Sequence, residues 1–84
     1  MKTIRDCFGR LIRLTDERMA HILRHPEMID MEPEIAHVLR APAEVRISRS
    51  DNTVQLFYEY YVKTRVGEKW LCAVVNMRQV MALS

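Results

Sequence analysis

Residues 54–64 read VQLFYEYYVKT, and the interpretation of this stretch decides the predicted fold. Its side chains alternate with a period of two, which is typical of a β-strand that presents two different faces. Stretches with the same period flank it on both sides, AEVRISR at 43–49 and KWLCAVV at 69–75. The sequence therefore predicts three consecutive antiparallel strands, with turns at the Asp-Asn pair 51–52 and the Val-Gly pair 66–67.

Two-residue turns at these positions determine which residues face each other across the strands. The first turn pairs Ile47 with Leu56 and Val45 with Tyr58, and the second pairs Tyr58 with Val75. Both registers collect the same apolar residues on one face, which is the predicted core side: Val45, Ile47, Val54, Leu56, Tyr58, Tyr60, Val62, Leu71, Ala73 and Val75. A slip of one residue would turn charged side chains toward the core, so this register is favoured.

The opposite face of the predicted sheet carries Arg46, Ser48, Gln55, Phe57, Glu59, Tyr61, Lys63, Trp70 and Cys72. Basic side chains can contact phosphates and aromatic rings can stack on bases, as in sheets that bind single-stranded RNA. The predicted RNA-binding residues are Arg46, Phe57, Tyr61, Lys63 and Trp70. An exposed aromatic face serves equally well as a homodimer interface, so the sequence leaves RNA and a second copy of the chain as alternative partners.

Two helices are predicted before these strands. Thr15 is suited to cap the first helix, which should run from Asp16 to about Arg24. The second helix should begin near Pro33 and end before Pro42, with apolar residues at helical spacing between them. With a short strand at residues 8–14, these elements predict an α+β fold in which two N-terminal helices pack on one face of an antiparallel sheet.

The composition indicates one small domain that spans residues 1–84, and the net charge of +2 is too low to indicate a polyanionic partner by itself. The charges near the N-terminus exclude a signal-peptide core, and no apolar run is long enough for a membrane span. We therefore expect a cytoplasmic protein with no membrane partner. Cys7 and Cys72 lie far apart in the sequence, which favours free thiols in a reducing compartment.

His21 and His25 lie four residues apart, one on the outer side of the first helix and one at its break. A zinc pair at this spacing needs both rings on regular helix and further ligands, so no metal and no cofactor are expected. Two histidines that titrate near neutral pH can act as base and acid in metal-independent RNA cleavage, with Arg13 stabilising the charged phosphorane. Ordinary solvated helix surface is the alternative interpretation.

Three blocks of the sequence resemble a known family: FGRLIRLTDERMAHILRHPEM at 8–28, EIAHVLRAPAEVRIS at 34–48 and LFYEYYVKTRVGEKWLCAVV at 56–75. Over about residues 4–75 they are similar, in the same order, to small bacterial and phage proteins of the barnase, EndoU, colicin and RelE-like (BECR) nuclease fold. The resemblance implies a RelE/barnase-like fold and a toxin-type RNase activity that requires no metal.

Residue by residue, Arg13, His21, His25 and Glu27 match the helix motif of that family, and Lys69 matches the basic residue that opens its late strand. The resemblance therefore implies a catalytic set of His21, His25, Arg13 and Lys69. These assignments predict RNA as the substrate.

The chain departs from the family at its end. Relatives continue with a strand that reads like V-T-A-Y and a short basic tail, whereas residues 80–84 here read VMALS. The missing hydroxyls and the missing tail predict a poorly formed last strand and an RNase domain with impaired catalysis. A non-catalytic binding or self-associating module on the same fold is the alternative function.

Overall fold

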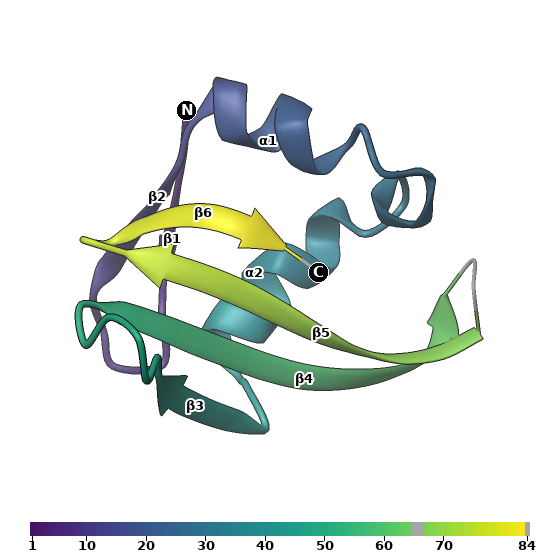
Figure 1. Cartoon of the computed structure of the whole chain (residues 1–84). Coiled ribbons are helices and arrows are strands. Elements are labelled where there is room, and N and C mark those ends of the chain that lie inside the picture. The colour runs from purple at the N-terminus through teal and green to yellow at the C-terminus, as the bar shows by residue number, and fades with distance from the viewer. Residues whose placement is uncertain (65–66, 84) are drawn as a thin grey trace.

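The computed structural model describes residues 1–64 and 67–83, and it describes the backbone alone for Glu27, Lys63 and Thr64. Figure 1 shows one twisted sheet with its helices on one side. In chain order the elements are β1 (Lys2–Arg5), β2 (Leu11–Leu14), α1 (Asp16–Ile22), the 3-10 helix η1 (Pro26–Met28), α2 (Glu32–Arg40), β3 (Glu44–Ile47), β4 (Val54–Thr64), β5 (Gly67–Asn76) and β6 (Gln79–Leu83). The strand order in the sheet is β1-β2-β6-β5-β4-β3.

The sheet is mixed, so the predicted fold class is wrong. A β1–β2 hairpin precedes the helices, and β2 runs parallel to β6 with Arg13 opposite Gln79, while the other neighbouring strands are antiparallel. The chain is a small mixed α/β domain in which strands outweigh two short helices, rather than N-terminal helices on a RelE/barnase-like antiparallel sheet. The parallel contact arises because β6 inserts between β5 and β2, a long-range pairing that local periodicity does not reveal.

The last strand, β6, is well formed over Gln79–Leu83, contrary to the prediction of a poorly formed strand, while Ser84 lies outside the described residues. Met77 and Arg78 both have positive φ, 51° and 60°, and together they make the tight two-residue turn that returns the chain from β5 into β6. Val80 and Leu83 are buried in the core. Apolar burial between two neighbouring strands therefore holds β6 in place without the hydroxyls of the family pattern.

The two helices lie where the sequence predicts them. Thr15 caps α1, since its Oγ1 accepts a hydrogen bond from the backbone N–H of Arg18 at 3.2 Å. The apolar residues of α2 at helical spacing, Ile35, Val38 and Leu39, are buried against the sheet. Neither helix in the described part of the chain combines the length and apolar character needed to cross a membrane.

The predicted strand registers are wrong on both sides of β4. Val45 faces Phe57 instead of Tyr58, and Phe57 in turn faces Ala73. The core therefore takes Phe57 and, at its margin, Tyr61, whereas Leu56, Tyr58 and Tyr60 point to the other face. Ile47, also predicted in the core, is 61% exposed at the sheet edge. The predictions for Leu71, Ala73 and Val75 are confirmed, since all three are buried.

Two local features shift the register. The backbone N–H of Ser48 bonds to the carbonyl of Val54 at 2.9 Å, so five residues rather than two separate the closing pair of the first hairpin. In the second hairpin an irregularity between Tyr61 and Thr64 changes the pairing. Both faces of β4 carry aromatic side chains, and an odd shift exchanges the faces. The shift that brings Phe57 into the core is tolerated because the polar residues of the same face find partners, Gln55 with Arg10 and Glu59 with His37.

Candidate functional site

His21 and His25 come together at the end of α1. His21 lies in the last turn of the helix, and His25 precedes η1 with extended backbone, φ −81° and ψ 119°. Both side chains are exposed, and their ring centroids lie 6.3 Å apart with planes at 85°. The pair therefore presents two neighbouring imidazoles to solvent at one end of α1.

Arg13 does not join this pair. Its neighbours Ile12 and Leu14 are buried under the helices, so by strand alternation Arg13 projects from the opposite face of the sheet. Its Nη2 donates a hydrogen bond to the carbonyl of Met77 at 3.1 Å. The implied catalytic cation is thus separated from the histidines by the sheet.

Lys69 faces Tyr61 near the far end of the β4–β5 hairpin, on the helix-covered side of the sheet. Among the described residues, no hydrogen bond or ion pair links Lys69 or Arg13 to either histidine. Glu27, the remaining residue of the family motif, has its side chain outside the described part of the structure. The structure therefore brings together two members of the implied catalytic set and leaves the other two elsewhere.

Two arginines that the sequence reasoning missed lie closer to the pair in the fold. Arg18 precedes His21 by three residues on α1, a spacing that places both on one side of the helix. Arg24 immediately precedes His25, and its backbone N–H bonds to the carbonyl of His21 at 3.3 Å. The three-residue spacing of Arg18 and His21 in the sequence could have indicated that the two side chains lie near each other. In the described residues, no set of three or more His, Cys, Asp or Glu side chains is placed to hold a metal ion.

The side of the sheet away from the helices is an aromatic and apolar surface, here called the open face. It comprises Arg46, Leu56, Tyr58, Tyr60, Trp70, Cys72 and Val74, which face one another across β3, β4 and β5. Trp70 is 54% exposed, and the centroids of the Trp70 and Tyr60 rings lie 5.4 Å apart. The guanidinium of Arg46 lies 5.8 Å from the centre of the Tyr58 ring. In Figure 1 α2 lies behind β4 and β5, on the other side of the sheet.

The predicted RNA-binding set is divided by this arrangement. Arg46 and Trp70 lie on the open face, as predicted, whereas Phe57 is fully buried and Tyr61 packs against the core. The side chain of Lys63 lies outside the described part of the structure. Tyr58 and Tyr60 replace Phe57 and Tyr61 on the open face because of the shifted register.

Acidic side chains accompany the rings of the open face. Arg46 Nε lies 3.0 Å from Glu44 Oε1, so the charge of this arginine is already compensated. The Tyr60 hydroxyl donates to Glu68, and this hydrogen bond raises the pKa of Tyr60 above its ordinary value. Carboxylates beside the stacking rings oppose the approach of a phosphate backbone. The open face is therefore better suited to a protein surface than to RNA.

A second group of titratable residues lies at the margin of the core and was missed in the sequence. His37 Nε2 lies 3.7 Å from Glu59 Oε2, and the His37 ring lies 6.1 Å from that of Tyr61. Burial, followed by the nearby carboxylates of Glu34 and Glu59, raises the pKa of Tyr61 to about 12. Tyr61 is therefore neutral near pH 7, where it serves as a hydrogen-bond donor rather than a base. Glu59 could have indicated this contact in the sequence, because a partly buried carboxylate within an aromatic strand requires a polar partner.

The histidine pair and the open face are thus two separate features on opposite sides of the sheet. Their assignment rests on the geometry of this chain, because no family model, no curated protein and no solved structure matches it.

Proposed function

We propose that the chain is a metal-independent RNase-like domain of low activity, in which His21 and His25 carry the protons. The observation that supports this function is the exposed imidazole pair, with ring centroids 6.3 Å apart. The resemblance of the helix motif to the BECR nuclease family supports the same assignment. Low activity follows from the position of Arg13, which lies on the other side of the sheet and leaves the pair without the implied cation.

In this mechanism one neutral histidine accepts the proton of the ribose 2′-OH. The 2′ oxygen then attacks phosphorus, the bond from phosphorus to the 5′ oxygen breaks, and the second, protonated histidine donates its proton to that oxygen. The products are a 2′,3′-cyclic phosphate and a free 5′-hydroxyl. Arg18 and Arg24 supply the positive charge that stabilises the phosphorane; Arg24 is exposed and Arg18 is partly exposed, so solvent weakens the effect.

Replacing both histidines tests this function. The His21→Ala, His25→Ala double variant should cleave a fluorogenic single-stranded RNA about 10²-fold more slowly than the wild type, because it lacks both proton carriers. His37→Ala is the matched control, since it removes an exposed histidine that contacts Glu59 instead. Wild-type cleavage should persist in EDTA, and a 2′-O-methyl substrate should remain intact.

Equal cleavage by the wild type and the double variant would assign the activity to a contaminant and contradict the proposal. Cleavage that EDTA abolishes would contradict the metal-independent mechanism. A loss of activity in His37→Ala comparable to that in the double variant would move the site to the His37–Glu59–Tyr61 group.

The open face favours a second function, self-association. The open face spans three strands about 4.8 Å apart and the stretch of β4 from Leu56 to Tyr60, so it covers on the order of 250 Å². Each partner in a stable protein interface buries roughly 800 Å², so the surrounding strands on the same side of the sheet must also contribute to the contact. Arg46 and Glu44 supply both signs of charge on one surface, as a symmetric pair of identical faces requires. We propose that two copies pair through their open faces.

Trp70→Glu should weaken this dimer at least about 30-fold, because an exposed tryptophan that becomes buried in an interface typically contributes about 2 kcal/mol or more. Ile47→Glu is the control, since Ile47 is similarly exposed, at 61%, but lies outside the open face. Light scattering over a concentration series reports the dissociation constant of both variants. A monomeric wild type at high micromolar concentration, or equal weakening by both substitutions, would contradict the dimer.

A further inference from the structure

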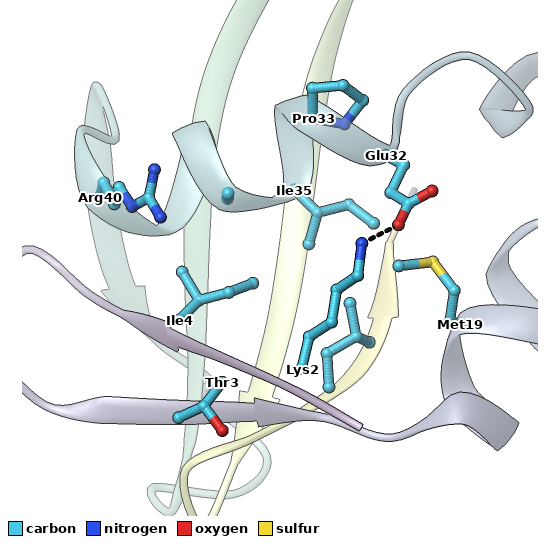
Figure 2. Close-up of a pocket in the computed structure, with 10 residues that line it drawn as sticks. Lys2, Thr3, Ile4, Met19, Glu32, Pro33, Ile35 and Arg40 are labelled. Carbon is cyan, nitrogen blue, oxygen red and sulfur yellow. Dashed lines mark hydrogen bonds and ion pairs between the residues drawn. The ribbon is translucent and has the colours of Figure 1, made fainter.

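A groove runs between the edge strand β1 and helix α2, here called the β1–α2 groove. Its cavity measures about 570 Å³. Ile4, Leu14 and Ile35 form an apolar floor, and Lys2, Glu32 and Arg40 stand at its rim. Figure 2 shows Lys2 and Ile4 on the strand side and Glu32, Ile35 and Arg40 on the helix side.

Polar contacts fix the two walls of the groove at both ends. At one end the backbone N–H of Cys7, two residues beyond β1, donates to the carbonyl of Leu39 at 2.9 Å. At the other end the Lys2 ammonium pairs with the Glu32 carboxylate across the opening (Figure 2). The strand and the helix are therefore held at a defined separation before any ligand arrives.

The strand wall carries hydrogen-bonding capacity that the sheet does not use. β1 is the last strand on its side of the sheet and pairs with β2 alone, so half of its backbone N–H and C=O groups point away from the sheet. Its four residues span about 13 Å, and the nine residues of α2 span about the same length. The walls match in length and accommodate an extended segment of about four residues.

The burial of the floor argues for a peptide rather than a small apolar ligand. Ile4, Leu14 and Ile35 are only 6%, 1% and 1% exposed, so a ligand in the groove would remove little further apolar surface from water. Binding must then depend on the backbone groups of β1 and on the charges at the rim. An added strand uses both.

The rim charges favour an acidic partner. The guanidinium of Arg40 is exposed and forms no ion pair or hydrogen bond with any residue that the structure describes. Arg5, whose Nη1 donates to the carbonyl of Gly9 at 2.7 Å, lies on the outer side of β1 and pairs with no carboxylate among the side chains that the structure describes. Glu32, the carboxylate among the described residues that line the groove, is already paired with Lys2. Carboxylates of a bound segment would therefore meet positive charge on both sides of β1.

We infer that the β1–α2 groove binds an extended acidic peptide segment, which adds to β1 as a seventh strand. Alternate apolar side chains of the segment enter the groove between Ile4 and Ile35. The intervening acidic side chains face Arg5, and a carboxylate at the end of the segment pairs with Arg40. This binding function is independent of the histidine pair and of the open face.

The test uses a fluorescein-labelled peptide, TVEVEV, with a free C-terminal carboxylate. It should bind the whole chain with amide chemical-shift changes concentrated at Thr3, Ile4 and Arg40. Arg40→Glu should weaken binding about fivefold or more, and Arg40→Gln should have an intermediate effect. Arg49→Glu, an equal charge change in the exposed loop before β4, should leave the affinity unchanged. The peptide TVKVKV with an amidated end should bind Arg40→Glu more tightly than the wild type.

Three outcomes would overturn this inference. The first is no shift at β1 with about 1 mM peptide, a concentration at which even a weak strand addition is detectable. The second is a shift pattern centred on Tyr58 and Trp70, which would move binding to the open face. The third is displacement of the peptide by decanoate with the same dependence on Arg40, which would identify the groove as a site for amphipathic carboxylates.

Discussion

Phe57→Ala should lower the free energy of unfolding by about 3–5 kcal/mol, the cost typical of removing a large aromatic side chain from a packed core. Phe57 is fully buried, and it faces Val45 on one neighbouring strand and Ala73 on the other. These neighbours belong to the two hairpins around β4, so they cannot both move into the cavity without breaking the sheet. Urea denaturation, monitored by circular dichroism, measures the free energy of unfolding of the wild type and the variant.

Tyr58→Ala is the matched control, because it removes an aromatic ring from the adjacent residue of the same strand. Tyr58 is half-buried on the open face, where it contacts the Arg46 guanidinium, and we expect a loss of about 1 kcal/mol. The opposite ranking, with Tyr58→Ala the more damaging change, would contradict the observed register. It would agree instead with the register that the turn residues predict.

Asp6→Ala should lower the free energy of unfolding by about 2–4 kcal/mol, because Asp6 is a buried carboxylate that holds the loop between β1 and β2 in place. Its Oδ1 accepts hydrogen bonds from the backbone N–H groups of Phe8 at 3.0 Å and Arg10 at 2.8 Å. Its Oδ2 accepts from Arg10 Nε at 2.9 Å. Arg10 Nη2 also donates to Gln55 Oε1 at 2.7 Å and thereby connects this loop to β4. The substitution leaves these donors without their acceptor.

The contribution of Asp6 to the free energy of unfolding should depend on pH. Burial alone would raise the pKa of this carboxyl, but the hydrogen bonds from Arg10 and Phe8 outweigh it, and the pKa lies below its ordinary value of 3.8. A group whose pKa is lower in the folded state contributes stability above its unfolded pKa, and the contribution is lost as the pH falls through the folded pKa. The difference in stability between the wild type and Asp6→Ala should therefore be full at pH 7 and shrink below pH 3.8.

Asp51→Ala provides the control for this prediction. Asp51 also has a lowered pKa, caused by hydrogen bonds from Thr53, but it lies exposed in the loop before β4. We expect a much smaller loss of stability than for Asp6→Ala. A difference between wild type and Asp6→Ala that stays constant from pH 7 to pH 2 would show that the loop does not depend on the ionised carboxylate.

Part of the candidate site was predictable from sequence because it depends on short-range spacing. His21 and His25 are four residues apart, so an intervening helix end necessarily leaves them near each other, and they do approach. Arg13 is close to them in the sequence but lies on the opposite face, because strand alternation at β2 buries Ile12 and Leu14 instead. The contact between His37 and Glu59 joins a helix to a strand, and no local pattern could reveal it.

The sequence by itself determined the local elements of this protein. Thr15 caps the N-terminus of α1, and Pro42 follows the end of α2. Both signals can be read from the sequence, because a cap and a proline affect the hydrogen bonds and dihedral angles of the adjacent backbone. The alternation within 54–64 likewise specifies a strand. Only the tertiary structure decided which face of β4 is buried and where β6 pairs. Phe57 and Tyr58 are both aromatic, so the choice between them depended on the five-residue loop, the irregularity after Tyr61 and packing under α2. Those contacts join residues far apart in the chain, and their energy depends on positions that local propensity does not specify.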